Sequence, residues 1–236
     1  MFRKKTHQPP QLFFENQPVS IRRDRRRKSV AIKVTDNRIS LHLPWRCPLS
    51  LGEKFLEQKQ EWLKNSLKKQ LNQPVRRYNN NSQQPYLGQS LQLRFKPQLT
   101  SSFILNDEQI QLKLPTDSDQ RIAKNKLSEA YQTLATDYLP QRGWQIAKKT
   151  GLMPARFRVR YYKSRWGSCH AGGEIRLNWQ LVQAPISVID YVLIHELCHL
   201  QEMNHSPAFW RLVGEQMPDF KIQRQWLKQQ GHTLLF

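Results

Sequence analysis

The chain of 236 residues has few cysteines, few acidic residues and no long apolar run, and each shortage excludes a class of protein. Cys47, Cys169 and Cys198 are an odd number at unrelated spacings, which excludes a disulfide framework. No apolar run is long enough to span a bilayer, and MFRKKTHQPP is charged without a following apolar stretch, unlike a secretory signal. We therefore expect a cytoplasmic protein with no membrane partner.

Acidic residues number 18 against 38 Lys and Arg, which gives a formal net charge of +20. This imbalance predicts an anionic partner such as a nucleotide or a nucleic acid; the alternative is a basic surface without a specific ligand. The densest run, Ile21–Ser29, holds six positive charges in nine residues. Arg25, Arg26 and Arg27 are its candidate anion-binding residues, although such a run is also typical of a solvated turn between strands.

The first half of the chain has mainly the period-two pattern of strands. We expect a loose arm over residues 1–18 and a β-rich region with one helix over residues 19–115. Val30, Ile32 and Val34 alternate before a turn and a second alternating stretch, which predicts a hairpin. A capping box at Ser50 predicts a helix to about residue 72. The strands that follow are expected to form one sheet with the hairpin, and we find no internal repeat.

Residues 116–236 have a mixed helix and strand pattern, which predicts an α+β domain. A helix is expected from Asp119 to Pro140, where it ends or kinks, and Pro140 fits the first turn of another helix that runs to about Lys149. Strands are expected around residues 157–162 and 174–178, on either side of a loop at 163–169. A second capping box, at Ser187, precedes an apolar helix, and Ser206-Pro207 is typical of the start of the next one. A last helix is expected from Asp219 to just before Gly231.

The sequence His195-Glu196-Leu197-Cys198-His199 has the spacing of a catalytic zinc site. Histidines at i and i+4 lie on one helix face, so both imidazoles can reach one ion at about 2.1 Å. Glu196 points roughly 100° round the helix, where it can accept a proton from a zinc-bound water without being a ligand. The alternative is that both histidines are satisfied core residues.

A catalytic zinc site needs a third protein ligand and one open position. His205 is the best candidate, because six residues after His199 the chain can leave the helix, turn at Asn204 and return. Glu215 on the following helix is the alternative third ligand. Cys198 points away from the histidine face and is expected to be a small core residue.

Two stretches of the sequence resemble the YgjP-like metallopeptidase family, relatives of the SprT-like zincins. They are YYKSRWGSCHAGGEIRLNWQLVQAP, at 161–185, and VIDYVLIHELCHLQEMNHSPAFW, at 188–210. RRRKSVAIKV, at 25–34, and EWL, at 61–63, also resemble it, so the resemblance covers roughly residues 20–230. It implies a zincin-like α+β catalytic domain with an HExxH helix behind a β-rich N-terminal region. It further implies that His195, His199 and His205 bind zinc and that Glu196 is the catalytic glutamate.

Two residues depart from related motifs. Cys198 stands where a small residue such as alanine is commoner, and a buried thiol of similar size should be tolerated. Glu202 stands where metzincins carry glycine, which argues against membership of that group. The resemblance also attaches a nucleoside-triphosphate pyrophosphatase activity to the family.

The predicted function is a zinc-dependent metallohydrolase of metallopeptidase type, with Glu196 as the general base. Arg165, Arg176 and Asn178 are candidates for binding the negative charge that develops on the substrate. The loop around Arg165 could instead be purely structural. A phosphoanhydride hydrolase acting on nucleoside triphosphates and a nucleic-acid-associated binding protein with structural zinc are the alternatives. The substrate is therefore a peptide or a nucleotide.

Overall fold

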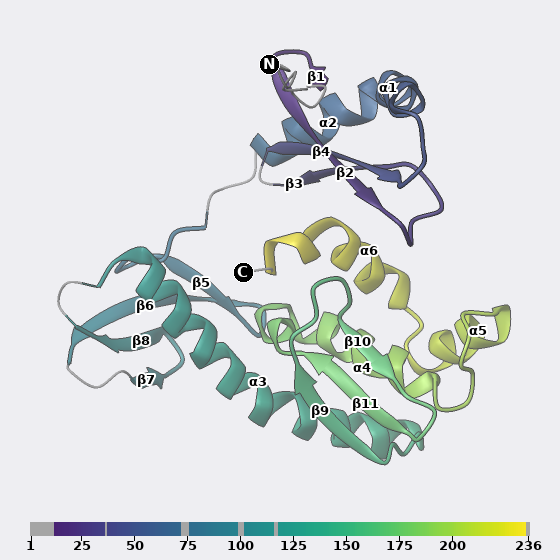
Figure 1. The fold of residues 1–236 in the computed structure, drawn as a ribbon. Coiled ribbons are helices and arrows are strands. Elements are labelled where there is room, and N and C mark those ends of the chain that lie inside the picture. Colours follow the sequence, from purple (N-terminus) through teal and green to yellow (C-terminus); the bar gives the residue numbers. More distant parts are fainter. Residues whose placement is uncertain (1–11, 36, 72–75, 99–101, 116–117, 235–236) are drawn as a thin grey trace, which may run out of the picture. The chain divides into compact units, whose positions relative to one another are not determined.

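The computed structural model describes residues 12–35, 37–71, 76–98, 102–115 and 118–234 (Figure 1). The chain divides into two compact units, Met1–Arg76 (unit 1) and Arg77–Phe236 (unit 2), which are treated separately below. Our boundary after residue 115 differs from this division, because the strands just before it share a hydrophobic core with the long helix that follows them. Residues 1–11 of the expected loose arm lie outside the described residues, whereas residues 12–18 contribute to strands.

Unit 1 is a four-stranded sheet with two helices. The strands are β1 (Leu12–Phe14), β2 (Gln17–Asp24), β3 (Ala31–Thr35) and β4 (Arg38–Pro44), in the spatial order β1-β2-β4-β3. The hairpin of β3 and β4 is confirmed, and β2 lies parallel to β4. The predicted single helix is two, α1 (Leu49–Gln58) and α2 (Gln60–Leu71). Pro48 precedes α1 without a side-chain cap, so the predicted capping box is wrong.

Unit 2 begins with a second four-stranded sheet. Its strands are β5 (Gln83–Tyr86), β6 (Gln89–Pro97), β7 (Ser102–Leu105) and β8 (Gln109–Leu114). Their order, β5-β6-β8-β7, and the parallel pairing of β6 with β8 repeat the arrangement in unit 1. We expected these strands and those of unit 1 to form a single sheet, and they form two. The two sheets repeat the same strand order and pairing, although the amino-acid sequence shows no internal repeat.

Helix α3 (Gln120–Thr150) crosses unit 2 (Figure 1). The Asp119 side chain caps it by accepting from the backbone N–H of Ile122 at 2.8 Å, and Gly151, with φ of 73°, ends it. Pro140 lies inside this continuous helix, so the predicted helix end there is wrong. Tertiary packing of the flanking turns outweighs the loss of one hydrogen bond. Among the described helices, none combines the length and apolar character that crossing a membrane requires.

The remainder of unit 2 holds a three-stranded sheet and the helices that carry the metal motif. The sheet, in the order β10-β11-β9, consists of β9 (Arg156–Arg160), β10 (Gly167–Cys169) and β11 (Glu174–Asn178). The helices are η1 (Trp179–Gln183), α4 (Ile186–Cys198), α5 (Pro207–Gln216), α6 (Phe220–Gln230) and η2 (Gly231–Leu234). The predicted α+β class is confirmed, with helices and a mixed sheet in one unit.

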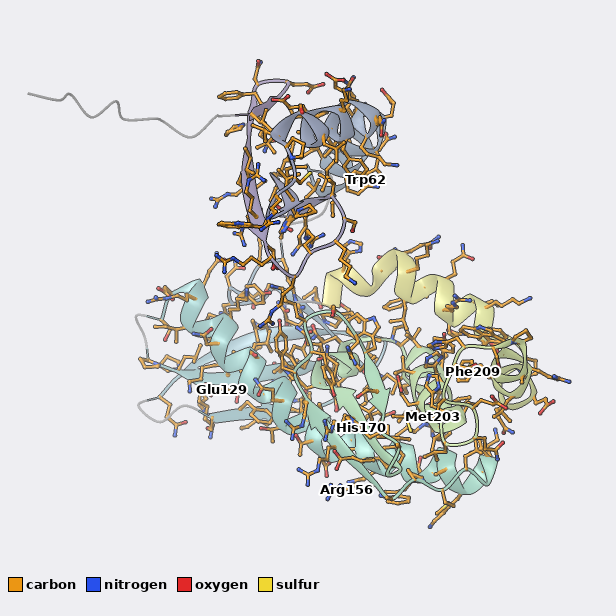
Figure 2. The ribbon with its side chains drawn as sticks, turned by 45° about the vertical axis from the view of Figure 1, so that its right-hand side comes forward. Trp62, Glu129, Arg156, His170, Met203 and Phe209 are labelled. Atoms are coloured by element: carbon orange, nitrogen blue, oxygen red, sulfur yellow. The ribbon has the colours of Figure 1, made fainter. Side chains whose placement is uncertain are left out.

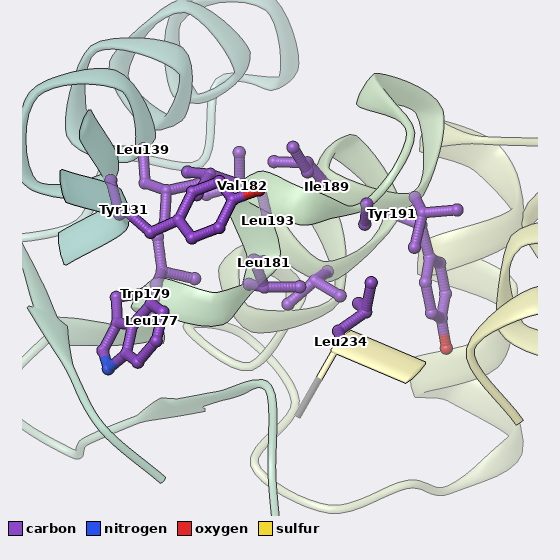
Figure 3. Packing of buried hydrophobic residues seen from close by; sticks show 14 of the residues in the cluster. Tyr131, Leu139, Leu177, Trp179, Leu181, Val182, Ile189, Tyr191, Leu193 and Leu234 are labelled. Carbon is purple, nitrogen blue, oxygen red and sulfur yellow. The ribbon is translucent and has the colours of Figure 1, made fainter. Parts of the chain in front are cut away.

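Helix α4 is held in the centre of unit 2 by packing and by one ion pair. Ile189 and Leu193 of α4 are fully buried, and they pack in the same core as Tyr131 of α3 and Leu181 of η1 (Figure 3). Asp190 accepts two hydrogen bonds from Arg142 of α3, at 2.7 and 2.6 Å. Asp190 was predicted to close a capping box, but α4 begins at Ile186 with Pro185 before it, so that prediction is wrong.

Candidate metal centre

Three histidine side chains converge where α4 ends. His195 lies on α4, His199 is its C-cap, and His205 comes from the loop that leads to α5. One ring nitrogen of each lies within 4.8 Å of the others, and the Nε2 atoms of His195 and His205 are 3.1 Å apart. Ligands on a tetrahedral zinc ion, each about 2.1 Å from it, are about 3.4 Å apart. The cluster therefore has the size that one metal ion requires.

The loop after α4 is shaped to return His205 to the helix. The side-chain oxygen of Asn204 accepts from the backbone N–H of Ser206 at 3.0 Å, which closes the turn expected at this position. Ser206 then caps α5 by accepting from the backbone N–H of Phe209, and Pro207 occupies the first turn, as predicted. Figure 2 labels Met203, which lies in this loop, and Phe209 of α5.

Backbone and aromatic groups orient the three rings. The Nδ1 atom of His199 lies 2.8 Å from the carbonyl oxygen of Glu202, an arrangement that places the ring proton on Nδ1 and leaves Nε2 for a metal. Phe209 stacks on His199 with ring centroids 4.4 Å apart, and Trp210 stacks on His205 at 5.6 Å. These aromatic side chains give the cluster an apolar side, which packs against the rings of His199 and His205.

Burial favours the uncharged, metal-binding form of two of the three histidines, His195 and His199. Burial, together with the neighbouring histidines, lowers the pKa of His195 to about 3, and burial also lowers the pKa of His199. Each neutral imidazole offers one lone pair to a cation. The Nδ1 atom of His195 is buried and has no hydrogen-bond partner among the described residues. Such an unpaired buried nitrogen costs about 1–3 kcal/mol.

Glu196 lies beside the cluster against strand β10. The residue is only 6% exposed, and its burial raises the pKa of the carboxyl group to about 8, against the opposing effects of Arg165 and of a backbone hydrogen bond from Cys169. A Cβ atom at Gly167 would lie 2.6 Å from the Oε1 atom of Glu196. Glycine at this point is therefore what lets the strand approach the carboxylate, a role that the sequence pattern did not reveal.

The other potential metal ligands near α4 lie in different surroundings. Glu215 lines a separate cavity of about 440 Å³ with Arg142 and Asp190, and it is not part of the histidine cluster. Cys198 is fully buried, as expected, and burial raises its pKa to about 12. Burial likewise raises the pKa of Cys169 to about 11. Neither thiol is disposed to form the thiolate that zinc binds.

The candidate anion-binding residues of unit 2 have different surroundings from one another. Arg165 is exposed, stacks 5.7 Å from the ring centre of Tyr162, and is close enough to Glu196 to lower its pKa. Asn178 is buried, and its side-chain amide donates to the carbonyl oxygens of Tyr162 and Arg165. Asn178 therefore holds the loop that carries Arg165, and we do not retain it as a group that contacts substrate.

Arg176 pairs with a neighbouring carboxylate on its own strand. Its Nε donates to Glu174. On the adjacent strand β9, Arg156 also donates to Glu174 and Arg158 forms an ion pair with it. Pairing of the Arg176 guanidinium with a protein carboxylate leaves less of it for a substrate oxyanion, which favours a structural role for this residue.

The three candidate arginines of unit 1 lie on the turn after β2. Arg25 stacks over the ring of Trp45 at 5.1 Å, and the backbone N–H of Arg26 donates to Asp24 at 2.8 Å. Arg25 and Arg26 are exposed and Arg27 is half-buried. These contacts are those of a turn between strands, and a role in binding anions stays a prediction.

Replacing Glu174 by glutamine is expected to destabilise unit 2 in a pH-dependent way. Hydrogen bonds from Arg176, then from Arg156, hold the pKa of Glu174 below its ordinary value of 4.5. A lowered folded-state pKa contributes stability above the unfolded-state pKa and loses it as the pH falls. The free energies of unfolding in urea of the original protein and the variant should thus differ most near pH 7. They should begin to converge below about pH 4.3 and become equal only below the lowered pKa of Glu174. A difference that is constant across this range would contradict the ion-pair explanation.

Comparison with known proteins assigns the family. Residues 28–230 match the family described as YgjP-like, metallopeptidase domain. One solved structure, titled "Crystal structure of the metallopeptidase zymogen of Pyrococcus abyssi abylysin", is 24% identical over 38% of this chain and 93% of that chain, at a TM-score of 0.33. No curated protein matches. Because the family match extends over most of the sequence, including all three histidines and Glu196, the chain belongs to the YgjP-like metallopeptidase family.

Proposed function

We propose that the chain is a zinc-dependent metallopeptidase in which His195, His199 and His205 hold one zinc ion. The observation that carries the proposal is the convergence of three imidazole nitrogens within 4.8 Å beside the buried carboxylate of Glu196. Three neutral imidazoles are a common donor set for catalytic zinc, because they leave one coordination position open. A structural site would be closed by a fourth protein ligand, whereas among the described residues the cluster at α4 consists of three donors.

Zinc bound at this cluster supplies Lewis acidity, which makes a water molecule more acidic and polarises a carbonyl group. Glu196 provides the proton transfer: its carboxylate accepts a proton from the attacking water and later delivers it to the leaving amine. Burial makes the Glu196 carboxylate a stronger base than an exposed one. The backbone N–H of Cys169 holds that carboxylate in place, and Gly167 gives it room.

Arg165 is the proposed partner for negative charge that develops on the substrate. Its guanidinium is exposed, and it is near enough to Glu196 for its charge to lower the pKa of that residue. Asn178 holds the backbone of Arg165 through its amide. A positioned guanidinium stabilises an oxyanion more effectively than a solvated one, because less reorganisation is needed during the reaction.

The substrate class is tested by incubating the zinc-loaded protein in parallel with casein-like peptides and with the four ribonucleoside triphosphates. The family match favours the peptides. The expected result is zinc-dependent cleavage of peptide bonds, detected as new amino termini, without release of pyrophosphate. Hydrolysis of the triphosphates alone would replace the peptidase proposal with that of a phosphoanhydride hydrolase.

Replacing Gly167 by alanine is expected to lower peptide turnover by about 10²-fold while zinc content stays unchanged. The new methyl group would lie 2.6 Å from Oε1 and 2.7 Å from Cγ of Glu196, so the carboxylate must move. A displacement of about 1 Å in a reacting group can cost this much. Gly172→Ala is the matched control, because a Cβ atom there meets nothing within 4 Å. Equal turnover by the two variants would refute the positioning of Glu196 by Gly167.

A further inference from the structure

The outer face of the β9–β11 sheet carries a stripe of arginines. Arg156, Arg158 and Arg160 alternate along β9 with Phe157 and Val159. The arginines are exposed and the two apolar side chains are half-buried, so one face of the strand is cationic and the other packs on the core. Arg156 lies at the periphery of unit 2 in Figure 2.

The neighbouring strand adds to this face. In the parallel register of β11 and β9, Arg176 is paired with Arg158, and Glu174 is paired with Arg156. Paired residues on adjacent strands project from the same face of a sheet. Four guanidiniums and one carboxylate therefore share this face, which leaves it a net charge of +3.

Glu174 organises the stripe and does not neutralise it. Its side chain is only 7% exposed. It accepts hydrogen bonds from the Nε atoms of Arg156 and Arg176 and forms an ion pair with Arg158. Arginine also has two terminal nitrogens. Among the described residues, those of Arg156 and Arg158 have no hydrogen-bond partner. Arg160 takes part in no ion pair there. The guanidiniums of Arg156 and Arg158 are thus held through Nε and can donate outwards from their terminal nitrogens.

We propose that the exposed part of this face, the arginine stripe of Arg156, Arg158 and Arg160, binds single-stranded nucleic acid through its phosphates. Guanidiniums bind phosphate oxygens in a bidentate manner. Arginines at alternate positions of one strand are spaced about 6.6 Å apart. This regular spacing suits a polyanion whose charged groups repeat along a chain. Tyr161 directly follows β9 and is 59% exposed. It offers an aromatic ring on which the unpaired bases of a single strand can stack.

The arginine stripe is separate from the metal centre. Gly167, which touches Glu196, is paired with Leu177, and Leu177 is fully buried in the core. Glu196 therefore lies on the inner side of the sheet and the stripe on its outer side. Nucleic acid bound to the stripe would leave the metal centre free, so this inference stands independently of the proposed peptidase activity.

The test measures how salt weakens binding of a fluorescein-labelled 20-nucleotide oligo(dT) to the full-length protein, by fluorescence anisotropy. The variant Arg158→Gln/Arg160→Gln removes two cations and leaves Glu174 paired with Arg156 and Arg176. The control Lys148→Gln/Lys149→Gln lowers the net charge equally, at exposed positions near the end of α3. Each lost phosphate contact should reduce the steepness of log K against log salt by about 0.7.

The expected result is a slope about 1.4 less steep for the stripe variant and an unchanged slope for the control. Arg160→Gln alone should give half this effect, which keeps the test informative if the double variant folds poorly. If the slope became less steep by the same amount in the stripe variant and in the control, the proposal would be refuted. Binding would then depend on the overall positive charge of the protein. A loss only in Arg25→Gln/Arg26→Gln would place binding in unit 1. Binding to duplex DNA, or to phosphatidylserine vesicles, that is tighter than binding to the oligo(dT) would also overturn the proposal.

Discussion

Glu196→Gln is expected to lower peptide turnover about 10²–10⁴-fold while one zinc ion per chain is retained. Glutamine preserves the size of the side chain, and its oxygen can still accept the hydrogen bond from the backbone N–H of Cys169. It cannot accept a proton from the attacking water. The loss should therefore appear in kcat with little effect on the fold, and it should be seen with any substrate that the protein hydrolyses.

Glu202→Gln is the matched control for this experiment. It makes the same chemical change a few residues away, and it preserves the backbone carbonyl that accepts from His199. Full zinc content with undiminished turnover in Glu196→Gln would contradict the proposed mechanism. It would then favour a binding protein in which the metal is structural.

His205→Ala is expected to weaken zinc binding by more than about 100-fold. Loss of a residue that merely orients a ligand already costs about 10–100-fold in metal affinity, and the loss of a ligand should cost more. The position of His205, with its Nε2 atom 3.1 Å from that of His195, supports its role as the third ligand. Competition with a chromophoric chelator measures the affinity directly.

Two variants make the ligand assignment specific. His170→Ala removes an exposed histidine outside the cluster and should leave zinc affinity unchanged. Glu215→Ala tests the alternative third ligand, and it should also have no effect because Glu215 lines a different cavity. If Glu215→Ala lost zinc while His205→Ala kept it, the assignment of His205 would be wrong.

The local pattern of the metal motif predicted its geometry well. The i, i+4 spacing of His195 and His199 and the Ser206-Pro207 start of α5 depend on short-range rules of helix geometry and capping. The α+β class and the family were predicted correctly for the same reason, because the motif and its flanks are continuous in the sequence. The roles of the histidines and of Glu196 stay predictions, which the experiments above address.

Features that depend on long-range packing could not be predicted. Pro140 inside α3 reads as a helix end, although the helix continues because its flanking turns are buried. The contact of Gly167 with Glu196 joins residues 29 positions apart. Arg176 was expected beside the substrate, but its partner Glu174 became apparent only from the strand register. In each case the deciding neighbour is distant in the sequence or lies across a sheet.

The central claim, one zinc ion on three histidines, is tested most directly by zinc K-edge X-ray absorption of the zinc-loaded protein. The account predicts one zinc per chain with three imidazole nitrogens at about 2.0–2.1 Å, one further light atom, and no sulfur. A sulfur shell at about 2.3 Å would identify a cysteine ligand. That result, or a spectrum with fewer than three imidazoles, would contradict the assignment of His195, His199 and His205.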